Sequence, residues 1–199
     1  MNGFEDRFGV TPPVKYMEEY EISSLYRTDF KRSYKEKYKK LSYTLTKTRK
    51  KRFEAYFRNL DKRGSDHFYS RRVALRYISK KVGYGVFANA DIPPYSTLCH
   101  YVGRVILTKN LKPDHDSSFS FNHFEKYSID AMKKGNWARF MNHSDLNSPT
   151  NNVLVWEYYS KDSPYIVFTS GHKGIKKGTQ LLYSYGEEYW KDRKSLKLK

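Results

Sequence analysis

The sequence predicts a mostly β domain that follows an α-helical N-terminal region. Residues 16–60 contain neither Gly nor Pro, and from residue 30 onward apolar side chains recur every three or four positions, as on one face of a helix. After residue 70 the chain changes to short apolar or β-branched runs separated by Gly, Pro, Asn and Asp. No helical stretch alternates regularly with these runs, which disfavours βαβ units.

The N-terminal region divides into a loop and one or two amphipathic helices. Residues 1–14 contain two Gly and a Pro pair, so we expect a loop there. Beyond the loop, Lys and Arg surround a single apolar stripe, and the expected helices are therefore basic on their other sides. The stripe consists of Phe30, Tyr34, Tyr38, Leu41 and Leu45, and Phe53, Phe57 and Leu60 continue it.

Seven runs of strand size follow the helical region. They span residues 73–78, 85–87, 97–106, 127–129, 153–159, 165–169 and 180–183. We therefore divide the chain into a basic helical N-terminal region at 1–69, a β domain at 70–190 and a basic C-terminal tail at 191–199.

The net charge of +17 is concentrated in one segment, because residues 31–72 hold 16 Lys and Arg against 4 Asp and Glu. Such a segment attracts nucleic acid, acidic protein surfaces or anionic lipid, and the competing interpretation is an ordinary solvated helix face. The sequence leaves three roles open: contact with nucleic acid through residues 31–72, packing on the β domain, and pairing with a second chain as a homodimer. Residues 47–52 also fit the weak pattern of a nuclear localisation cluster.

Composition excludes several classes of protein. Cys99 is the single cysteine, which rules out an internal disulfide and a cysteine-cluster zinc site. The N-terminus has no signal-peptide pattern, and no apolar run is long enough to cross a bilayer. We therefore expect neither secretion through a signal peptide nor contact with a membrane.

Two segments far apart in the sequence carry the chemistry. They end in Asn142-His143-Ser144 and in Tyr183-Ser184-Tyr185-Gly186. Together they could line a pocket with amide, imidazole and phenol groups, without a strong nucleophile or a pair of carboxylates. Such a pocket suits a reaction that depends on positioning and on the exclusion of water.

A third segment contains Gly83-Tyr84-Gly85, with glycines two positions apart that let the backbone approach a ligand closely. By itself this pattern is more often a plain hairpin turn. It is not a nucleotide-binding loop, because no third glycine follows at the dinucleotide spacing and no Gly-Lys-Ser/Thr follows.

These three segments together resemble the core motifs of the SET-domain protein lysine methyltransferases. The resemblance covers residues 70–190, and its most specific part is 127–144, which matches the family's central motif almost residue for residue. The chain is more similar to the compact SET proteins of viruses and intracellular bacteria than to the large nuclear enzymes. It has Asp145 where members with a zinc-binding C-terminal segment have Cys, so we expect no metal.

The resemblance implies a SET-domain fold of several small sheets with a knot-like C-terminal crossing. It also implies S-adenosylmethionine as the cofactor, with the ring of Trp190 stacked on its adenine; packing of Trp190 in the core is the rival interpretation. The expected cofactor-binding residues are Gly83, Tyr84, Gly85, Arg139, Asn142, His143 and Trp190.

The resemblance further implies a tyrosine-lined channel for the substrate lysine. Tyr185 matches the family's essential tyrosine, and Tyr183 matches the position where Tyr or Phe sets how many methyl groups fit, which favours a mono- or dimethyl product. Tyr101 and Tyr127 are expected to complete the channel. The family often carries acidic residues at the positions of His100, Gln180 and Ser184.

These matches imply methyl transfer to a protein lysine, with histone tails as the favoured substrate and the nucleus as the site of action. Export from an intracellular bacterium into a host cell is one route to that site. The alternative is a catalytically weak SET-fold module that binds chromatin, which the missing acidic residues leave open.

Overall fold

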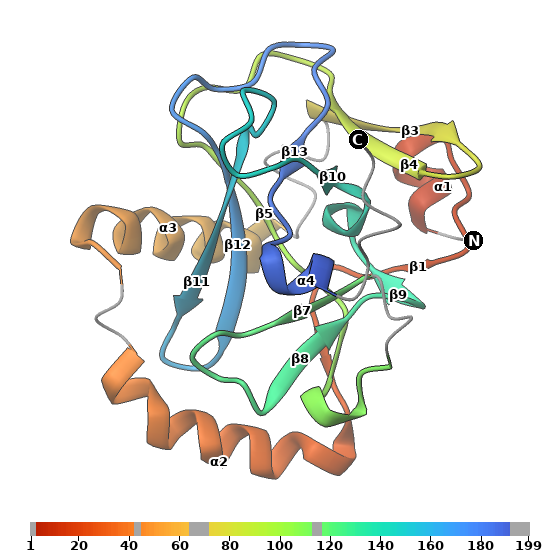
Figure 1. The fold of residues 1–199 in the computed structure, drawn as a ribbon. Coiled ribbons are helices and arrows are strands. Elements are labelled where there is room, and N and C mark those ends of the chain that lie inside the picture. Colours follow the sequence, from red (N-terminus) through yellow and green to blue (C-terminus); the bar gives the residue numbers. More distant parts are fainter. Residues whose placement is uncertain (1–2, 42–44, 64–71, 113–116, 192–199) are drawn as a thin grey trace.

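Small β-sheets and flanking helices make up the computed structural model, which describes residues 3–41, 45–63, 72–112 and 117–191 (Figure 1). The helices are α1 (Gly3–Phe8), α2 (Ser24–Leu41), α3 (Lys47–Arg63) and α4 (Glu187–Lys191), with 3-10 turns η3 (Thr108–Asn110) and η4 (Trp137–Phe140). The prediction of a mostly β chain with a helical N-terminal region is confirmed. Within the described ranges, no helix is both long and apolar enough to cross a membrane.

Two larger sheets form the centre of the fold. The first has the order β2-β6-β8-β7 and contains β2 (Glu21–Ile22), β6 (Arg104–Leu107), β8 (Tyr127–Asp130) and β7 (Ser118–Ser120). The second has the order β11-β12-β5 and contains β11 (Val153–Tyr159), β12 (Pro164–Ser170) and β5 (Thr97–His100), all antiparallel.

Three two-stranded sheets complete the β structure. The antiparallel pair is β3 (Val73–Ser79) with β4 (Gly83–Ala88). The parallel pairs are β1 (Lys15–Tyr16) with β9 (Lys134–Gly135), and β10 (Asn142–His143) with β13 (Leu182–Tyr183). Several small sheets in place of one large sheet are what the family resemblance predicted.

Helix α1, at residues 3–8, is part of the main core. A loop was predicted for residues 1–14, but residues 3–8 form α1 because Phe4 is fully buried there. Its ring meets Tyr16 at 4.9 Å and Phe140 at 5.4 Å between ring centroids. Because β1 and β2 also pair with strands of the later region, the N-terminal region packs closely with it; the division at residues 69 and 70 stays a prediction.

The apolar stripe of α2 packs against the chain's own core. Phe30 and Tyr34 are buried, and their rings contact Phe124 at 5.3 and 5.7 Å. The Tyr34 hydroxyl also donates to the carbonyl of Ser160 at 2.6 Å, in the turn between β11 and β12. The central residues of this stripe therefore have partners in the chain's own core, which favours the packing interpretation, and pairing with a second chain stays a prediction. The side chain of Leu41 lies outside the described residues.

Helix α3 covers one face of the β11-β12-β5 sheet (Figure 1). Phe53 is fully buried against Tyr158, and the ring of Phe57 lies 4.1 Å from that of Tyr165. Burial of one such aromatic side chain contributes about 1.5–3 kcal/mol. These contacts dock α3 on the sheet, and the many charged residues of the helix occupy its other sides.

The predicted strand at 97–106 is divided into β5 and β6. Gly103 lies at the break, and a Cβ atom there would come within 2.4 Å of the carbonyl oxygen of Asp130. The backbone of the two segments can therefore approach this closely only at glycine. Burial on both sides concealed the turn, since residues 97–102 before it and Val105 after it are buried.

His100, at the end of β5, is buried beneath α3. Only 3% of the residue is exposed, and its ring lies among Tyr56, Phe57 and Tyr165. The Nδ1 atom is 3.2 Å from the Tyr56 hydroxyl. Burial lowers the pKa of His100 to about 4, so the neutral ring is the folded form at neutral pH.

This lowered pKa predicts that the protein loses stability as the pH falls. The unfolded chain binds a proton at His100 near pH 6.5, whereas the folded chain binds it only near pH 4, so the free energy of unfolding decreases through that window. Between pH 7.5 and 5.5 the loss from this residue should be about 1 kcal/mol. Denaturant unfolding of wild type and His100→Gln at both pH values measures it; an equal pH dependence of the two proteins would contradict the assignment.

Candidate functional site

The parallel pairing of β10 with β13 joins the two segments that the sequence singled out. Asn142 is paired with Leu182 and His143 with Tyr183, and the amide of Ser144 donates to the carbonyl of Tyr183 at 3.0 Å. Two motifs separated by some forty residues are thereby placed side by side. This is the juxtaposition that the predicted C-terminal crossing requires.

Asn152 stabilises this crossing through hydrogen bonds. Its side-chain Nδ2 donates to the carbonyl of Gln180 at 2.8 Å, and its Oδ1 accepts from the amide of Leu182 at 3.0 Å. Its backbone amide also donates to the carbonyl of Leu182 at 3.2 Å. An asparagine side chain can donate and accept at once, so one residue pairs with two backbone groups of the second motif.

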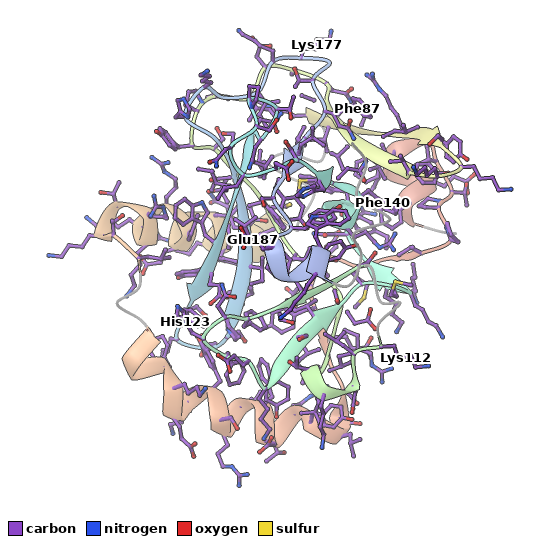
Figure 2. All side chains as sticks on the ribbon, viewed as in Figure 1. Phe87, Lys112, His123, Phe140, Lys177 and Glu187 are labelled. Atoms are coloured by element: carbon purple, nitrogen blue, oxygen red, sulfur yellow. The ribbon has the colours of Figure 1, made fainter. Side chains whose placement is uncertain are left out.

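A cavity of about 610 Å³ opens between the β3-β4 hairpin, the central motif and α4. Its volume lies in the range of about 300–1,000 Å³ that is usual for small-molecule sites. Phe140 belongs to its wall and is labelled in Figure 2. The lining residues among those predicted to bind a cofactor are Gly83, Tyr84, Arg139, Asn142, His143 and Trp190.

Gly85 lies behind this cavity and not in its lining. A Cβ atom there would come within 2.6 Å of Ile78 Cδ1, 2.7 Å of Gln180 Nε2 and 3.2 Å of Asn142 Nδ2. The predicted contact of Gly85 with a ligand is therefore corrected: the missing side chain makes room for the amide of Asn142. That amide donates to the carbonyl of Tyr84 at 3.3 Å and so connects the hairpin to the central motif.

His143 connects the two motifs through its ring. Its Nδ1 accepts a hydrogen bond from the amide of Tyr185 at 3.2 Å, so the proton of the neutral ring lies on Nε2, 3.2 Å from the carboxylate of Asp145. The ring also packs edge-on against Trp190 at 4.8 Å between centroids. One histidine thus contacts both the segment that contains Tyr185 and helix α4.

Trp190 lies where the larger cavity adjoins a neighbouring one. It lines both the 610 Å³ cavity and a second one of about 650 Å³, and His143 is shared by the same two. The Trp190 ring is parallel to that of Tyr185, at 6.1 Å and 4°. The residue therefore combines packing with exposure to the cavity, so the two sequence interpretations are compatible.

A smaller cavity of about 250 Å³ lies on the other side of the crossing, and its walls are largely aromatic. Its described lining residues include no Asp or Glu. Tyr101 and Tyr183 are 2% and 7% exposed, and burial raises the pKa of both phenols. The lining residues are Tyr101, Ser118, Phe119, Ser120, Asn122, Arg139, Tyr183, Tyr185 and Tyr189.

The two cavities share a wall made of Arg139, Tyr185 and Tyr189. The Tyr185 hydroxyl donates to the carbonyl of Met141 at 2.7 Å, which fixes the phenol at this junction. The guanidinium of Arg139 is held by the carbonyl of Ala131 and the hydroxyl of Ser117, each at 2.8 Å. Burial lowers the pKa of Arg139 from its usual value without removing its charge at neutral pH.

Tyr127 does not belong to the site, and its predicted place in the channel is corrected. Its ring is fully buried at 5.0 Å from Phe30, and its hydroxyl donates to the carboxylate of Asp29 on α2. The residue therefore anchors the N-terminal helix to β8. Its position in the central motif concealed this, because the motif continues from a structural strand into the site.

Two residues that line the smaller cavity were missed by the sequence analysis. Phe119 belongs to β7, and its ring lies parallel to that of Tyr183 at 6.4 Å and 5.6 Å from that of Tyr101. Tyr189 contacts Tyr185 edge-on at 4.8 Å. The alternation in Ser118-Phe119-Ser120 is a weak strand signal, and a run of three residues does not show which cavity it would face.

The comparisons with known proteins identify the family. Residues 83–186, just over half of the chain, match the SET domain, and the chain belongs to the SET-domain family. It is 34% identical over 121 residues to the human histone-lysine N-methyltransferase EHMT1, which covers 57% of this chain and 9% of that protein. The chain therefore spans only a small part of the curated relatives that it matches.

Solved structures extend the likeness in fold beyond the matched domain. ATXR5 in complex with histone H3.1 mono-methylated on R26 superposes with a TM-score of 0.68 at 19% identity, covering 93% of this chain and 84% of that one. The ctPRC2 complex bound to S-adenosylmethionine has a TM-score of 0.51 at 26% identity, covering 62% and 16%. The first likeness includes most of the N-terminal helical region. No comparison bears on a relationship to viral or bacterial proteins, which stays a prediction.

No group of three or more His, Cys, Asp or Glu side chains in the described ranges gathers as a metal site. The metal-free active site expected from Asp145 also stays a prediction.

Proposed function

We propose that this protein transfers a methyl group from S-adenosylmethionine to the ε-amine of a protein lysine, and that a histone tail is its substrate. The observation that carries the proposal is the pair of cavities that meet at Tyr185, Arg139 and Tyr189. A two-substrate transfer needs two sites that share one point of contact. The larger cavity suits the cofactor and the smaller, aromatic cavity suits a lysine side chain.

The residues of the larger cavity fit S-adenosylmethionine. Arg139 and Lys81 supply positive charge for a carboxylate, and Tyr84 and Trp190 supply aromatic faces for a purine. Gly83 contributes a wall without a side chain. When bound, the cofactor supplies an electrophilic methyl group on a sulfonium cation. We expect Asn142 to act mainly by fixing the hairpin, since its amide is bonded to Tyr84.

The smaller cavity favours the neutral form of lysine. A lysine in water has a pKa of about 10.4, so roughly one molecule in a few thousand is neutral at pH 7. A desolvated channel next to a sulfonium would lower that pKa through burial and like-charge repulsion, whereas a carboxylate would raise it. Tyr101 and Tyr183 are buried there, and with the ring of Phe119 they would exclude water from the amine.

Methyl transfer then depends on alignment of the amine with the methyl group more than on general acid–base catalysis. The smaller cavity would present the lone pair of the amine nitrogen to the methyl group that the bound cofactor would supply, and the carbon–sulfur bond would break as the nitrogen–carbon bond forms, with its electron pair left on sulfur. The amine loses one proton to solvent before attack. Tyr185, held by Met141, is placed to orient the nitrogen along the line of attack. Contacts from the polarised methyl hydrogens to carbonyl oxygens would add a smaller directional effect.

A histone tail is the favoured substrate because the relative EHMT1 is a histone-lysine N-methyltransferase and one fold neighbour was solved with histone H3.1. The site of action would then be chromatin in the nucleus. Export from an intracellular bacterium into a host cell stays a prediction about how the protein reaches it.

A catalytically weak chromatin-binding module is the alternative. Gln180 and Ser184 stand where the family has acidic residues. The backbone carbonyl of Gln180 accepts a hydrogen bond from the side chain of Asn152, which is a structural contact. The intact junction of Tyr185 with both cavities favours the active enzyme. Binding of the cofactor without transfer to any protein would favour the module.

Tyr185→Phe tests the proposal most directly. Loss of the oriented hydroxyl should lower methyl transfer from labelled S-adenosylmethionine to core histones by about 10²–10³-fold, while cofactor affinity by calorimetry stays unchanged. Tyr95→Phe is the control, because that tyrosine is 46% exposed and lies outside both cavities. Wild-type binding without histone labelling would indicate another protein substrate, and absence of cofactor binding would contradict the proposal.

Tyr183→Phe should increase the number of methyl groups per lysine. Its hydroxyl is buried in the channel, where it takes space or holds a water molecule that an added methyl group would need. We expect a mono- or dimethyl product from wild type and a shift toward the next methylation state in the variant. Mass spectrometry of a lysine peptide measures the shift; an identical product distribution would exclude Tyr183 as the determinant.

We also propose that the outer faces of α2 and α3 contact nucleic acid. Lys47, Lys51 and Arg58 are exposed, and their spacing places them on the side of α3 opposite Phe53. Lys31 and Lys35 are exposed in the same way on α2. Chromatin offers lysine tails beside an anionic polymer, and such stripes would bring a basic enzyme to it by attraction to phosphates.

Charge reversal tests this contact. Lys47→Glu with Lys51→Glu should weaken binding to a short DNA duplex by at least about tenfold and reduce the slope of log affinity against log salt by about two. Lys173→Glu with Lys177→Glu changes the net charge equally at exposed positions of another loop. Fluorescence anisotropy at several salt concentrations measures both, and equal losses in the two variants would mean that only overall charge matters.

A further inference from the structure

We propose that Tyr56 and His100 are positioning residues for the lysine channel, so that α3 supports the channel wall from behind. This inference rests on the proposed methyl transfer, which it extends to a helix outside the matched domain. Neither residue lines either of the two cavities that meet at Tyr185. Their effect would pass through Tyr101, which follows His100 directly in the chain.

His100 and Tyr101 face opposite sides of the same sheet. Neighbouring side chains in extended backbone alternate between the two faces, and Tyr101 continues the pairing of β5 because its amide donates to the carbonyl of Ile166 at 2.8 Å. The Tyr101 ring lies 5.6 Å from Phe119 on the channel side. The His100 ring lies 5.4 Å from Phe57 on the α3 side.

Hydrogen bonds hold this segment on both sides. The Tyr56 hydroxyl is 3.2 Å from Nδ1 of His100, which makes a polar contact between α3 and this part of β5. The carbonyl of His100 accepts from Nδ2 of Asn136 at 2.8 Å, and Asn136 begins the turn that leads to Arg139. His100 therefore contacts α3 through its ring and, through its backbone carbonyl, a chain segment that continues into the shared wall.

The position of His100 is where SET proteins often carry an acidic residue. In this chain a neutral, buried ring replaces the charge, and α3 covers it. An ion at this place would need solvent or a cation, whereas an imidazole can pack among aromatic rings and keep one hydrogen bond. The channel wall of this protein therefore depends on a helix that lies outside residues 83–186.

The proposal predicts a selective kinetic defect. Methyl transfer is sensitive to small displacements of a channel wall, since alignment supplies much of its rate. Tyr101 lines the smaller cavity and is not among the residues lining the larger one. Loosening it should therefore reduce kcat/KM for a lysine peptide while leaving the affinity for S-adenosylmethionine unchanged.

Tyr56→Phe and Tyr34→Phe form a matched pair for the test. Each variant loses one hydroxyl hydrogen bond between an N-terminal helix and the β11-β12-β5 region, the second at the Ser160 carbonyl away from the channel. We expect Tyr56→Phe to lower kcat/KM for the peptide about fivefold, the equivalent of one lost hydrogen bond of about 1 kcal/mol, with an unchanged cofactor Kd. Tyr34→Phe should lose comparable stability and keep its peptide kinetics.

A second measurement keeps the test independent of activity. Hydrogen–deuterium exchange of the peptide covering residues 97–102 should become faster in Tyr56→Phe and stay at the wild-type rate in Tyr34→Phe. Equal exchange in both variants, or equal loss of kcat/KM in both, would overturn the positioning role. A wild-type protein without methyl transfer would refute the proposed function, and the exchange data would still decide whether α3 supports the β5 segment.

Discussion

The parallel pairing of β10 with β13 is the contact on which the site depends. Each strand has two residues, yet their register places His143 beside Tyr183 and brings Tyr185 to the wall between two cavities. So short a ladder contributes few backbone hydrogen bonds of its own. Asn152 and the ring of His143 add side-chain bonds across it, so the crossing is held by groups that also shape the site.

The N-terminal third stabilises the same region from outside. Phe4 packs against Phe140 beside the larger cavity, and Phe30 packs against Tyr127 at the end of the four-stranded sheet. Small sheets bury little surface by themselves, so a fold made of several needs added elements to complete its core. Helices α2 and α3 supply aromatic side chains inward and keep their charge outward, which explains how one region is both the most basic and well packed.

The charge distribution separates two physical tasks. Net positive charge on exposed helices acts over a distance of about one Debye length, roughly 8–10 Å, and favours encounter with an anionic polymer. The smaller cavity differs from these exposed basic surfaces, because its phenols are desolvated and the described residues that line it include no carboxylate. In the proposed mechanism, attraction to a polyanion would act on the exposed helices, and loss of the lysine charge would occur only inside the smaller cavity.

The sequence by itself determined the class of fold, the helical region and the residues of the two central motifs, because periodicity and contiguous motifs are local properties of the chain. It identified Asn142, His143 and Tyr185 for that reason. Only the tertiary structure decided that Phe119 lines the smaller cavity and that residues 3–8 form helix α1. It also decided that Tyr127 lies outside that cavity, with its hydroxyl bonded to Asp29. Those outcomes depend on sheet register and on burial among residues distant in sequence, and no local pattern encodes such contacts.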